Sequence, residues 1–171
     1  MNTEKKKHAA DEGADLKRLQ ELVVAHYAGD IHSIHGIAHW RRVERFGLEI
    51  AGESGADILV VRLFAWLHDS RRQNDNTDAG HGARAADWLL ELHGSCFVLE
   101  AERLELLRYA CRWHTERTAT DDLTIGACWD ADRLDLTRVG TLPDEAYLNT
   151  AHGKALCRHI RRQLRPGHRQ A

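Results

Sequence analysis

Apolar residues recur every three or four positions along most of the chain, and no long stretch alternates with the period of two that is typical of strands. The first such segment covers residues 16–27, and Gly29 and Asp30 end it. Further helices are expected over the ranges 37–52, 56–68, 81–93, 99–113, 123–136 and 144–164. This pattern predicts an all-α protein of six or seven helices.

The segment at 56–68 is apolar almost all round, whereas the others have one polar side. A helix without a polar face is buried, so this segment is expected at the centre of a helical bundle. The polar stretch that follows, 69–80, is predicted to be a loop of the kind that often carries function. We therefore expect a single helical domain over residues 15–165, with a flexible polar tail at 1–14 and a second tail at 166–171.

Composition narrows the class of protein. A length of 171 residues corresponds to about one domain, and 24 Lys and Arg residues nearly balance 26 Asp and Glu residues, which argues against a binder of duplex nucleic acid. No apolar run has the roughly 18–20 residues of a membrane span, and the charged N-terminus lacks the apolar core of a secretory signal. The four cysteines form no C-x-x-C pair, which is typical of reduced thiols in a cytoplasmic protein. A membrane partner is not expected, and nothing in the sequence predicts the oligomeric state.

Histidine is abundant, with 12 residues, and the candidate chemistry lies where predicted helices end. The side chains at these ends are His39, His68, Asp69, His81, His114, Asp130, Asp132 and Asp135. Imidazole and carboxylate ligands suit Fe, Mn, Zn, Ni or Co, and Mg is a further candidate. The doublet His68-Asp69 closes the apolar helix, where burial would be costly unless the two groups were paired or bound to a metal.

The motifs HGIAHWRRV around His39, AWLHD around the doublet and DADRLDL around Asp132 resemble the HD-domain superfamily of metal-dependent phosphohydrolases. The resemblance covers residues 31–140. It implies an all-α HD-like bundle in which one metal ion is held by His39, His68, Asp69 and Asp132. Asp132 is preferred as the last ligand because it stands in the A-D-[RK]-L context of the family, and Asp130 and Asp135 would then contact a ligand or the substrate.

Some members of the superfamily bind a second metal through two further histidines, and His81 and His114 stand in the corresponding places. Asp69 could then bridge two ions. His81 follows His68 by only 13 residues, which leaves little room for a helix between them. Whether the site binds one ion or two therefore stays open. The alternative role for these two histidines is contact with the substrate.

The expected chemistry is attack on phosphorus by a metal-activated water, with Asp69 or Asp130 as its base. Cationic side chains would bind the phosphate. Arg71 and Arg72, directly after the doublet, are the first choices for this role, and Arg84 and Arg133 are the second. His35, four residues before His39, is a weaker candidate for contact with the substrate.

The sequence thus favours a cytoplasmic, metal-dependent phosphohydrolase that cleaves a phosphate ester or anhydride. Its partner would be a small phosphorylated substrate, with a nucleotide as the favoured class. One alternative is a di-iron oxygenase of the same fold, which requires both His81 and His114 to bind iron. The other is a non-catalytic nucleotide-binding domain.

Overall fold

Helices make up most of residues 13–164, the part of the chain that this computed structural model describes. The α-helices are α2 (Leu16–His26), α3 (Ile37–Ser54), α4 (Ile58–Leu67), α5 (His81–Leu92), α6 (Ala101–Trp113), α7 (Leu123–Leu134) and α8 (Ala151–Gln163). Two 3₁₀-helices, η1 (Asp135–Val139) and η2 (Glu145–Tyr147), lie between α7 and α8. No strand occurs among the described residues, so the all-α prediction is confirmed. The tails predicted at 1–14 and 166–171 fall almost entirely outside them.

Helix α4 lies at the centre of the bundle, as its apolar character predicts. Asp57 caps its start by accepting a hydrogen bond at 3.1 Å from the backbone N–H three residues later. Every residue from Leu59 to Leu67 except Arg62 is buried. Helices α3, α6 and α7 pack around α4, and α3 approaches so closely at Gly47 that a Cβ there would lie 2.5 Å from Val61 Cγ1. This packing fixes the C-terminal end of α4, which is followed by the His-Asp doublet.

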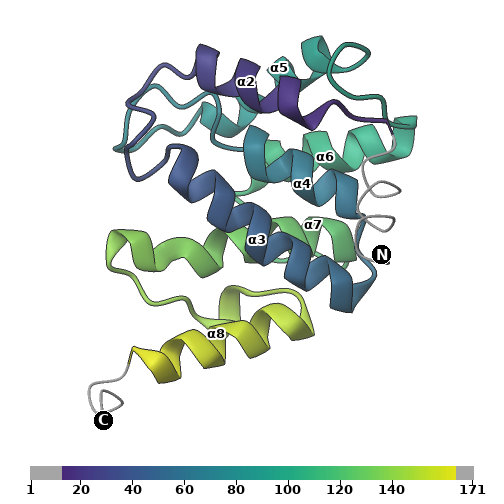
Figure 1. Cartoon of the computed structure of the whole chain (residues 1–171). Coiled ribbons are helices and arrows are strands. Elements are labelled where there is room, and N and C mark those ends of the chain that lie inside the picture. Colours follow the sequence, from purple (N-terminus) through teal and green to yellow (C-terminus); the bar gives the residue numbers. More distant parts are fainter. Residues whose placement is uncertain (1–12, 165–171) are drawn as a thin grey trace, which may run out of the picture.

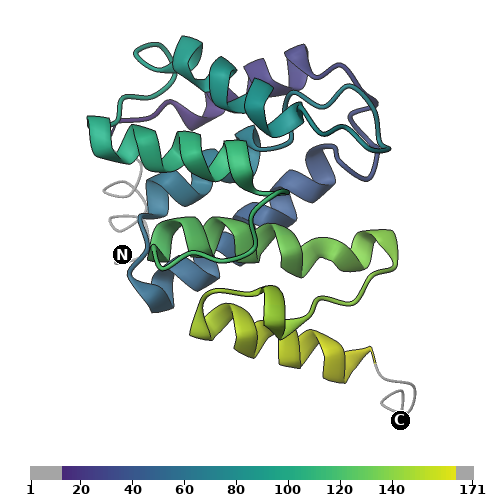
Figure 2. The ribbon, with the colours of Figure 1, turned by 180° about the vertical axis from the view of Figure 1, so that it is seen from behind.

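Helices α4, α6 and α7 run in the same general direction, and α3 runs the opposite way. In Figure 1, α3 begins on the left and descends to the right. Seen from behind in Figure 2, α6 and α7 lie side by side and both run from left to right. The C-terminal ends of α4, α6 and α7 and the N-terminal end of α3 therefore gather on one side of the bundle.

The last helix is shorter than the predicted range 144–164, because α8 begins only at Ala151 and the residues before it include η2. The physical reason is Asp130 in α7. Its buried carboxylate accepts hydrogen bonds from the backbone N–H groups of Asn149 and Thr150, both at 2.8 Å. These bonds hold an extended backbone, and the side chain of Thr150 then caps α8.

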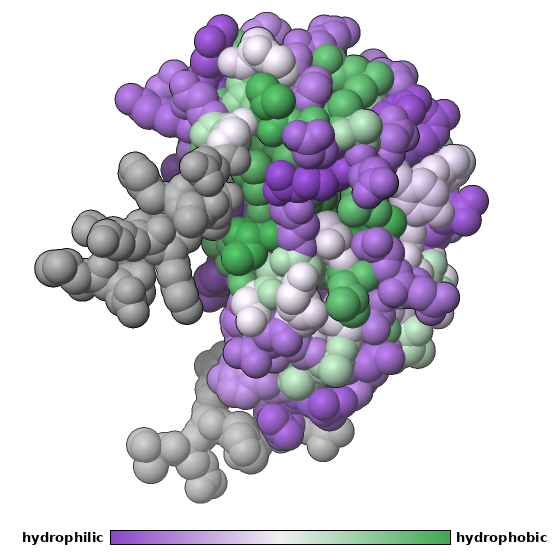
Figure 3. All heavy atoms as spheres, turned by 90° about the vertical axis from the view of Figure 1, so that its right-hand side faces the viewer, coloured by the Kyte–Doolittle hydropathy of each residue, from purple (hydrophilic) through white to green (hydrophobic). Residues whose placement is uncertain are grey.

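The face that Figure 3 turns to the viewer lies at the other end, where α4, α6 and α7 begin. Apolar side chains are exposed at the starts of these helices, with Ile58 37% and Leu123 55% exposed. Figure 3 shows such apolar patches separated by hydrophilic residues, which is ordinary for a protein surface. None of the helices between residues 13 and 164 combines the length and the apolar character that crossing a bilayer requires.

Candidate metal centre

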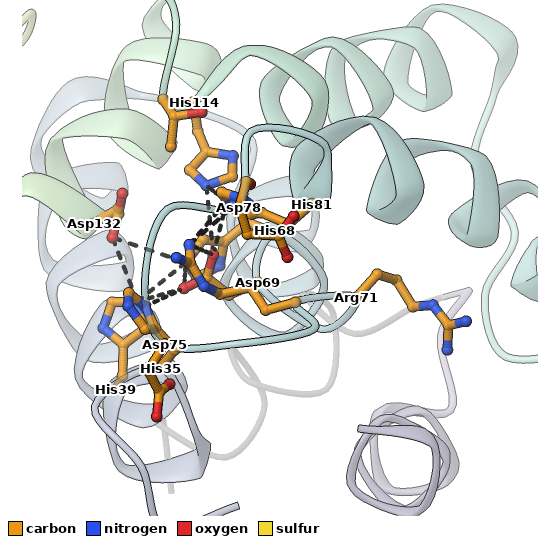
Figure 4. Close-up of polar contacts among 12 residues, drawn as sticks. His35, His39, His68, Asp69, Arg71, Asp75, Asp78, His81, His114 and Asp132 are labelled. Carbon is orange, nitrogen blue, oxygen red and sulfur yellow. Dashed lines mark hydrogen bonds and ion pairs between the residues drawn. The ribbon is translucent and has the colours of Figure 1, made fainter. Parts of the chain in front are cut away.

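Six histidine and aspartate side chains converge where the ends of five helices meet (Figure 4). They are His39 in the first turn of α3, His68 and Asp69 directly after α4, His81 at the start of α5, His114 directly after α6, and Asp132 in the last turn of α7. The exposed fraction is at most 3% for five of these side chains and 17% for Asp132. These six are the residues that the resemblance assigns to one or two metal ions, and the structure brings all of them together.

The first ligand group consists of His39, His68, Asp132 and one oxygen of Asp69. His39 Nε2 lies 3.1 Å from His68 Nε2 and 3.4 Å from Asp132 Oδ1. Asp69 Oδ2 lies 3.6 Å from His39 Nε2 and 3.8 Å from His68 Nε2. Two nitrogens that bind one ion at about 2.0–2.1 Å and at a right angle are roughly 3 Å apart, so these separations fit four ligands of a single ion.

The second ligand group consists of His81, His114 and the other oxygen of Asp69. Asp69 Oδ1 lies 3.1 Å from His81 Nε2 and 3.6 Å from His114 Nε2, and the two Nε2 atoms are 2.9 Å apart. Asp69 therefore presents one carboxylate oxygen to each group. This is the arrangement of a carboxylate that bridges two ions.

The short spacing between His68 and His81 does not keep His81 away, because the 69–80 loop folds back without forming a helix. Asp78 holds this loop: it accepts a hydrogen bond from the backbone N–H of Gln73 at 2.9 Å and pairs with Arg84 at 2.6 Å. The loop thus returns the imidazole of His81 to the end of α4.

The four histidines of the ligand groups share one orientation, in which Nδ1 contacts an acceptor and Nε2 faces the centre. The acceptors are Asp135 Oδ2 for His39, the carbonyls of Phe64 and Ala65 for His68, the carbonyl of Asp78 for His81 and that of Cys111 for His114. Carbonyl oxygens and ionised carboxylates only accept, so each Nδ1 carries a hydrogen and each neutral ring has an unprotonated Nε2. Metal-binding histidines are oriented in this way. Facing Nε2 lone pairs at 2.9 and 3.1 Å would repel one another unless a proton or a metal ion lies between them.

The charges of the buried groups also attract a cation. Burial raises the pKa of Asp69 and Asp132, but the neighbouring histidines outweigh it and hold both values well below the usual range. Burial lowers the pKa of His68 to about 3, so this ring is neutral at physiological pH. Burial also lowers the pKa of His39 and His114, yet Asp132 and Asp69 outweigh it and raise both. Because Asp69 and Asp132 stay ionised although they are buried, their oxygens are suited to bind a cation.

The helix ends contribute in the same direction. The C-terminal ends of α4, α6 and α7 carry partial negative charge, and these three ends outnumber the N-terminal ends of α3 and α5, which meet here with partial positive charge. Imidazole nitrogen and carboxylate oxygen together suit divalent Fe, Mn, Co, Ni or Zn better than the metals that thiolates select. The residues present therefore fit a pair of divalent transition-metal ions.

Of the two arginines after the doublet, only Arg72 lies at the ligand groups. Its Nη1 is 3.5 Å from Asp69 Oδ1 and 3.3 Å from His81 Nε2. Arg71 points away (Figure 4), and its guanidinium lies 5.0 Å from the centre of the Trp88 ring. Of the two residues predicted to contact phosphate, Arg71 is therefore corrected, because adjacent residues of this turn project in different directions and only Arg72 reaches the ligand groups.

The second choices for phosphate contact are also corrected. Arg84 pairs with Asp78 and holds the loop described above. Arg133 donates hydrogen bonds to the carbonyls of Thr118 and Tyr147 at 3.0 and 2.9 Å. Both guanidinium groups are engaged in holding backbone segments, and the contact of Arg133 with a ligand residue is to the backbone carbonyl of His114, at 3.4 Å.

Asp130, the alternative base for water, lies apart from the ligand groups and is fully buried. Its two oxygens accept four hydrogen bonds, from the backbone N–H and side chain of both Asn149 and Thr150. Because this fills its lone pairs, its role is to secure the start of α8 rather than to activate water. Asp135, by contrast, touches a ligand, since it accepts the Nδ1 hydrogen of His39 at 2.7 Å.

Two further groups stand at the edge of the centre. His35 Nδ1 lies 3.0 Å from Asp69 Oδ2, and its spacing of four residues from His39 is a weak signal for this position. Arg138 in η1 places Nη2 4.0 Å from Asp132 Oδ1 and is 10% exposed. No sequence motif predicts Arg138, because only the turn after α7 brings it back to the ligand groups.

Comparison with known proteins agrees on the fold. No family model matches the chain, and no curated protein is significantly similar to it in sequence. Among solved structures, that of a predicted HD superfamily hydrolase from an uncultured Thermotogales bacterium is similar, with a TM-score of 0.68 and 24% sequence identity. The similarity covers 88% of this chain and 87% of that chain. The chain therefore shares the all-α fold of this HD superfamily protein.

Proposed function

We propose that the chain is a metal-dependent phosphohydrolase that cleaves a phosphate ester or anhydride at a pair of divalent ions. The observation that carries this proposal is the position of Asp69, whose two oxygens face two separate groups of imidazole nitrogens. Two ions joined by a shared carboxylate can stabilise both the attacking and the leaving oxygen of a displacement at phosphorus. The similar solved structure is described as a predicted hydrolase, which supports the same reaction class.

The charges around the centre favour an anionic substrate. Three carboxylates, those of Asp69, Asp132 and Asp135, are matched by the three guanidinium groups of Arg42, Arg72 and Arg138. Two divalent ions would therefore add positive charge that the surrounding protein does not balance. A phosphate group supplies negative charge and several acceptor oxygens, which match both metal ions and guanidinium donors. Within this class we propose a nucleotide, in line with the resemblance of the motifs.

A divalent ion bound here would lower the pKa of a coordinated water toward about 7 and so supply hydroxide at neutral pH. The protein's own residues orient the reactants. Asp69 holds the two ligand groups at a fixed separation. The guanidinium of Arg72 is fixed by hydrogen bonds to the carbonyls of Asn74 and Asn76, so that Nη1 can donate to a non-bridging phosphate oxygen.

The proposal is tested by counting metal ions per chain, using elemental mass analysis of protein purified without chelator. We expect about two transition-metal ions in the unaltered protein and about one in His81→Ala. His26→Ala is the matched control, because His26 is an exposed histidine at the end of α2, outside the ligand groups, and this variant should keep both ions. No metal in any of the three, even after reloading with Mn or Fe, would contradict a metal-dependent enzyme.

Turnover is then measured with the metal-loaded protein and a panel of nucleotides, as release of inorganic phosphate or pyrophosphate. Release of phosphate or pyrophosphate by the unaltered protein, and its loss in His39→Ala, would support the proposal. Binding of a nucleotide without release, at full metal occupancy, would favour a non-catalytic nucleotide-binding domain instead.

One observation keeps a second candidate, the di-iron oxygenase, in view: His81 and His114 both converge on Asp69, as that activity requires. The two candidates differ in the metal and in the second reactant. Oxygen uptake by the iron-loaded protein, together with no phosphate release in the manganese-loaded protein, would replace the phosphohydrolase. Phosphate release with manganese and no oxygen uptake with iron would exclude the oxygenase.

A further inference from the structure

A hollow of about 360 Å³, which we call the lateral hollow, is lined in part by residues that directly follow ligands in the chain. It opens between the loop after α6 and the segment that joins α7 to α8. Its lining combines three large apolar side chains, Leu136, Leu142 and Tyr147, with the polar residues Thr115, Thr118, Arg133, Thr141 and Asp144. It is of the size that accepts a small organic group, because ligand pockets begin at about 300 Å³.

The lateral hollow begins at residues that adjoin two of the ligands. Thr115 directly follows His114, and Arg133 directly follows Asp132. Asp132 is also the one member of the ligand groups whose side chain is more than 3% exposed. Asp132 is therefore the most solvent-exposed of the ligands, and the residue that follows it, Arg133, lines the lateral hollow.

A second hollow, of about 310 Å³, shares Thr115 with the lateral hollow. Arg72 and His81 line it, together with polar loop residues that include the acids Asp78 and Glu116. Its cation and hydrogen-bonding groups suit phosphate oxygens. Because Thr115 lines both hollows, a substrate with its phosphate at the ligand groups would meet a polar space on one side and the lateral hollow on the other.

The lateral hollow has large apolar side chains, which the second hollow lacks. Leu142 and Tyr147 are large apolar residues that stay 48% and 55% exposed, and both line it with Leu136. Arg133 gives the hollow its shape, because it joins the carbonyl of Thr118 on one wall to that of Tyr147 on the other. Apolar side chains gathered in a preformed hollow beside a reactive centre indicate a binding surface for an apolar group.

We propose that the lateral hollow binds the organic group of the substrate and so selects phosphate esters whose alcohol carries a ring-sized apolar face, such as an aromatic ring or a nucleobase. This inference rests on the proposed phosphohydrolase function. It assigns the specificity of the enzyme to Leu136, Leu142 and Tyr147, while the ligand groups and Arg72 hold the phosphate.

The test compares two phosphonates, which resist hydrolysis, by calorimetric titration of the metal-loaded protein. Phenylphosphonate carries a ring and methylphosphonate does not, whereas the phosphonate group is common to both. We expect phenylphosphonate to bind about tenfold more tightly or more, because the ring buries on the order of 100 Å² of additional apolar surface. In Leu142→Ala and in Tyr147→Ala this preference should fall at least about threefold, with methylphosphonate affinity unchanged.

Val139→Ala is the matched control. Val139 is 43% exposed on the same segment but does not line the lateral hollow, so its removal should change neither affinity. Equal affinity for the two phosphonates, or an equal loss of both in Leu142→Ala, would overturn the inference and leave the phosphohydrolase standing. Failure of both phosphonates to bind at full metal occupancy would overturn the proposed function and the inference with it.

Discussion

Arg71 and Arg72 are neighbours in the chain, yet only Arg72 faces the candidate metal centre, so the two form a matched pair for mutation. We expect Arg72→Ala to reduce kcat/KM for a phosphate substrate by roughly tenfold or more, because a hydrogen bond to a charged group contributes about 1.5–3 kcal/mol. Arg71→Ala removes the cation over the Trp88 ring and a hydrogen bond to the carbonyl of His26, both away from the ligand groups, and should leave kinetics and metal content unchanged. Steady-state kinetics of both variants checks this, and equal losses would contradict the placement of Arg72.

Asp69 offers a second test at the scale of one residue, because each of its oxygens serves a different ligand group. In Asp69→Asn one oxygen becomes an amide nitrogen, which donates hydrogen bonds and does not bind a metal ion. We expect the metal content to fall from about two ions per chain to one or none, with helix content by circular dichroism retained. Asp75→Asn is the control. Asp75 lies in the 69–80 loop and accepts a hydrogen bond from Ser33, and its variant should keep two ions per chain. Two ions per chain in Asp69→Asn would exclude the bridging role.

Side-chain direction is what the sequence predicts least well at this scale. Asp130 and Asp132 belong to one motif and are both buried acids, but two positions on a helix differ by roughly 200° around its axis. One therefore faces α8 and the other faces His39. The motif context selects Asp132 correctly as the residue beside the histidines, whereas residue type alone does not remove Asp130 from the candidates for a base.

At the scale of elements, the approach of α5 to α6 sets the second ligand group. A Cβ at Gly82 would lie 2.7 Å from the carbonyl oxygen of Cys111, so Gly82→Ala must push the start of α5 away from the end of α6. We expect this to separate His81 from His114 and to leave about one ion per chain. Gly52→Ala, at a helical position with no atom within 4 Å of the added carbon, should keep both ions.

The contact between α4 and α6 gives a prediction about stability. Asp57 caps α4 and pairs with Arg103 of α6 at 2.6 Å, and Asp57→Asn keeps a capping oxygen while removing the charge. We expect this variant to lose about 1 kcal/mol or less of unfolding free energy at neutral pH, because the pair is partly exposed. Urea unfolding of both proteins measures the difference.

The same pair predicts a pH dependence. Burial raises the pKa of Asp57, but the hydrogen bond from Arg103 outweighs it and holds the pKa below its ordinary value of 3.8. A depressed pKa in the folded state stabilises the protein above the ordinary value and ceases to do so as the pH falls through the folded value. The difference in stability between the unaltered protein and Asp57→Asn should therefore be full at pH 7 and shrink progressively below pH 3.8.

The helices were predictable wherever apolar residues recur at helical spacing, because burial of that apolar stripe drives each helix into the bundle. The start of α8 was not, since residues 144–150 fit a helical pattern and only the distant carboxylate of Asp130 holds them extended. The sequence does not predict that the 69–80 loop folds back to the ligand groups, for the same reason. This fold depends on the ion pair between Asp78 and Arg84, which no sequence pattern indicates.

At the scale of the whole molecule, metal binding should be coupled to folding. The ligands span positions 39 to 132 on five helices, so the unfolded chain has no preformed site and the ions bind the folded state preferentially. An ion at 100 times its dissociation constant adds about 2.7 kcal/mol, which corresponds to a rise in Tm of roughly 5–10 °C for a chain of this size. Differential scanning calorimetry before and after chelation should show this loss, and Mn or Fe should restore it. In His39→Ala restoration should be smaller, and an equal effect there would contradict the assignment of His39.

The two ends of the bundle are not equally free to change. The connection between α3 and α4 and the one between α5 and α6 lie away from the ligand-bearing ends. The first turns at Gly55, whose left-handed φ of 78° favours glycine, and an added Cβ there would meet no atom within 4 Å. Insertions and altered lengths in these connections leave the ligands in place, whereas the connection between α4 and α5 carries Arg72 and fixes His81. Sequence changes among descendants of this chain should therefore accumulate at the end of the bundle away from the ligands, whereas the ligand-bearing end should be conserved.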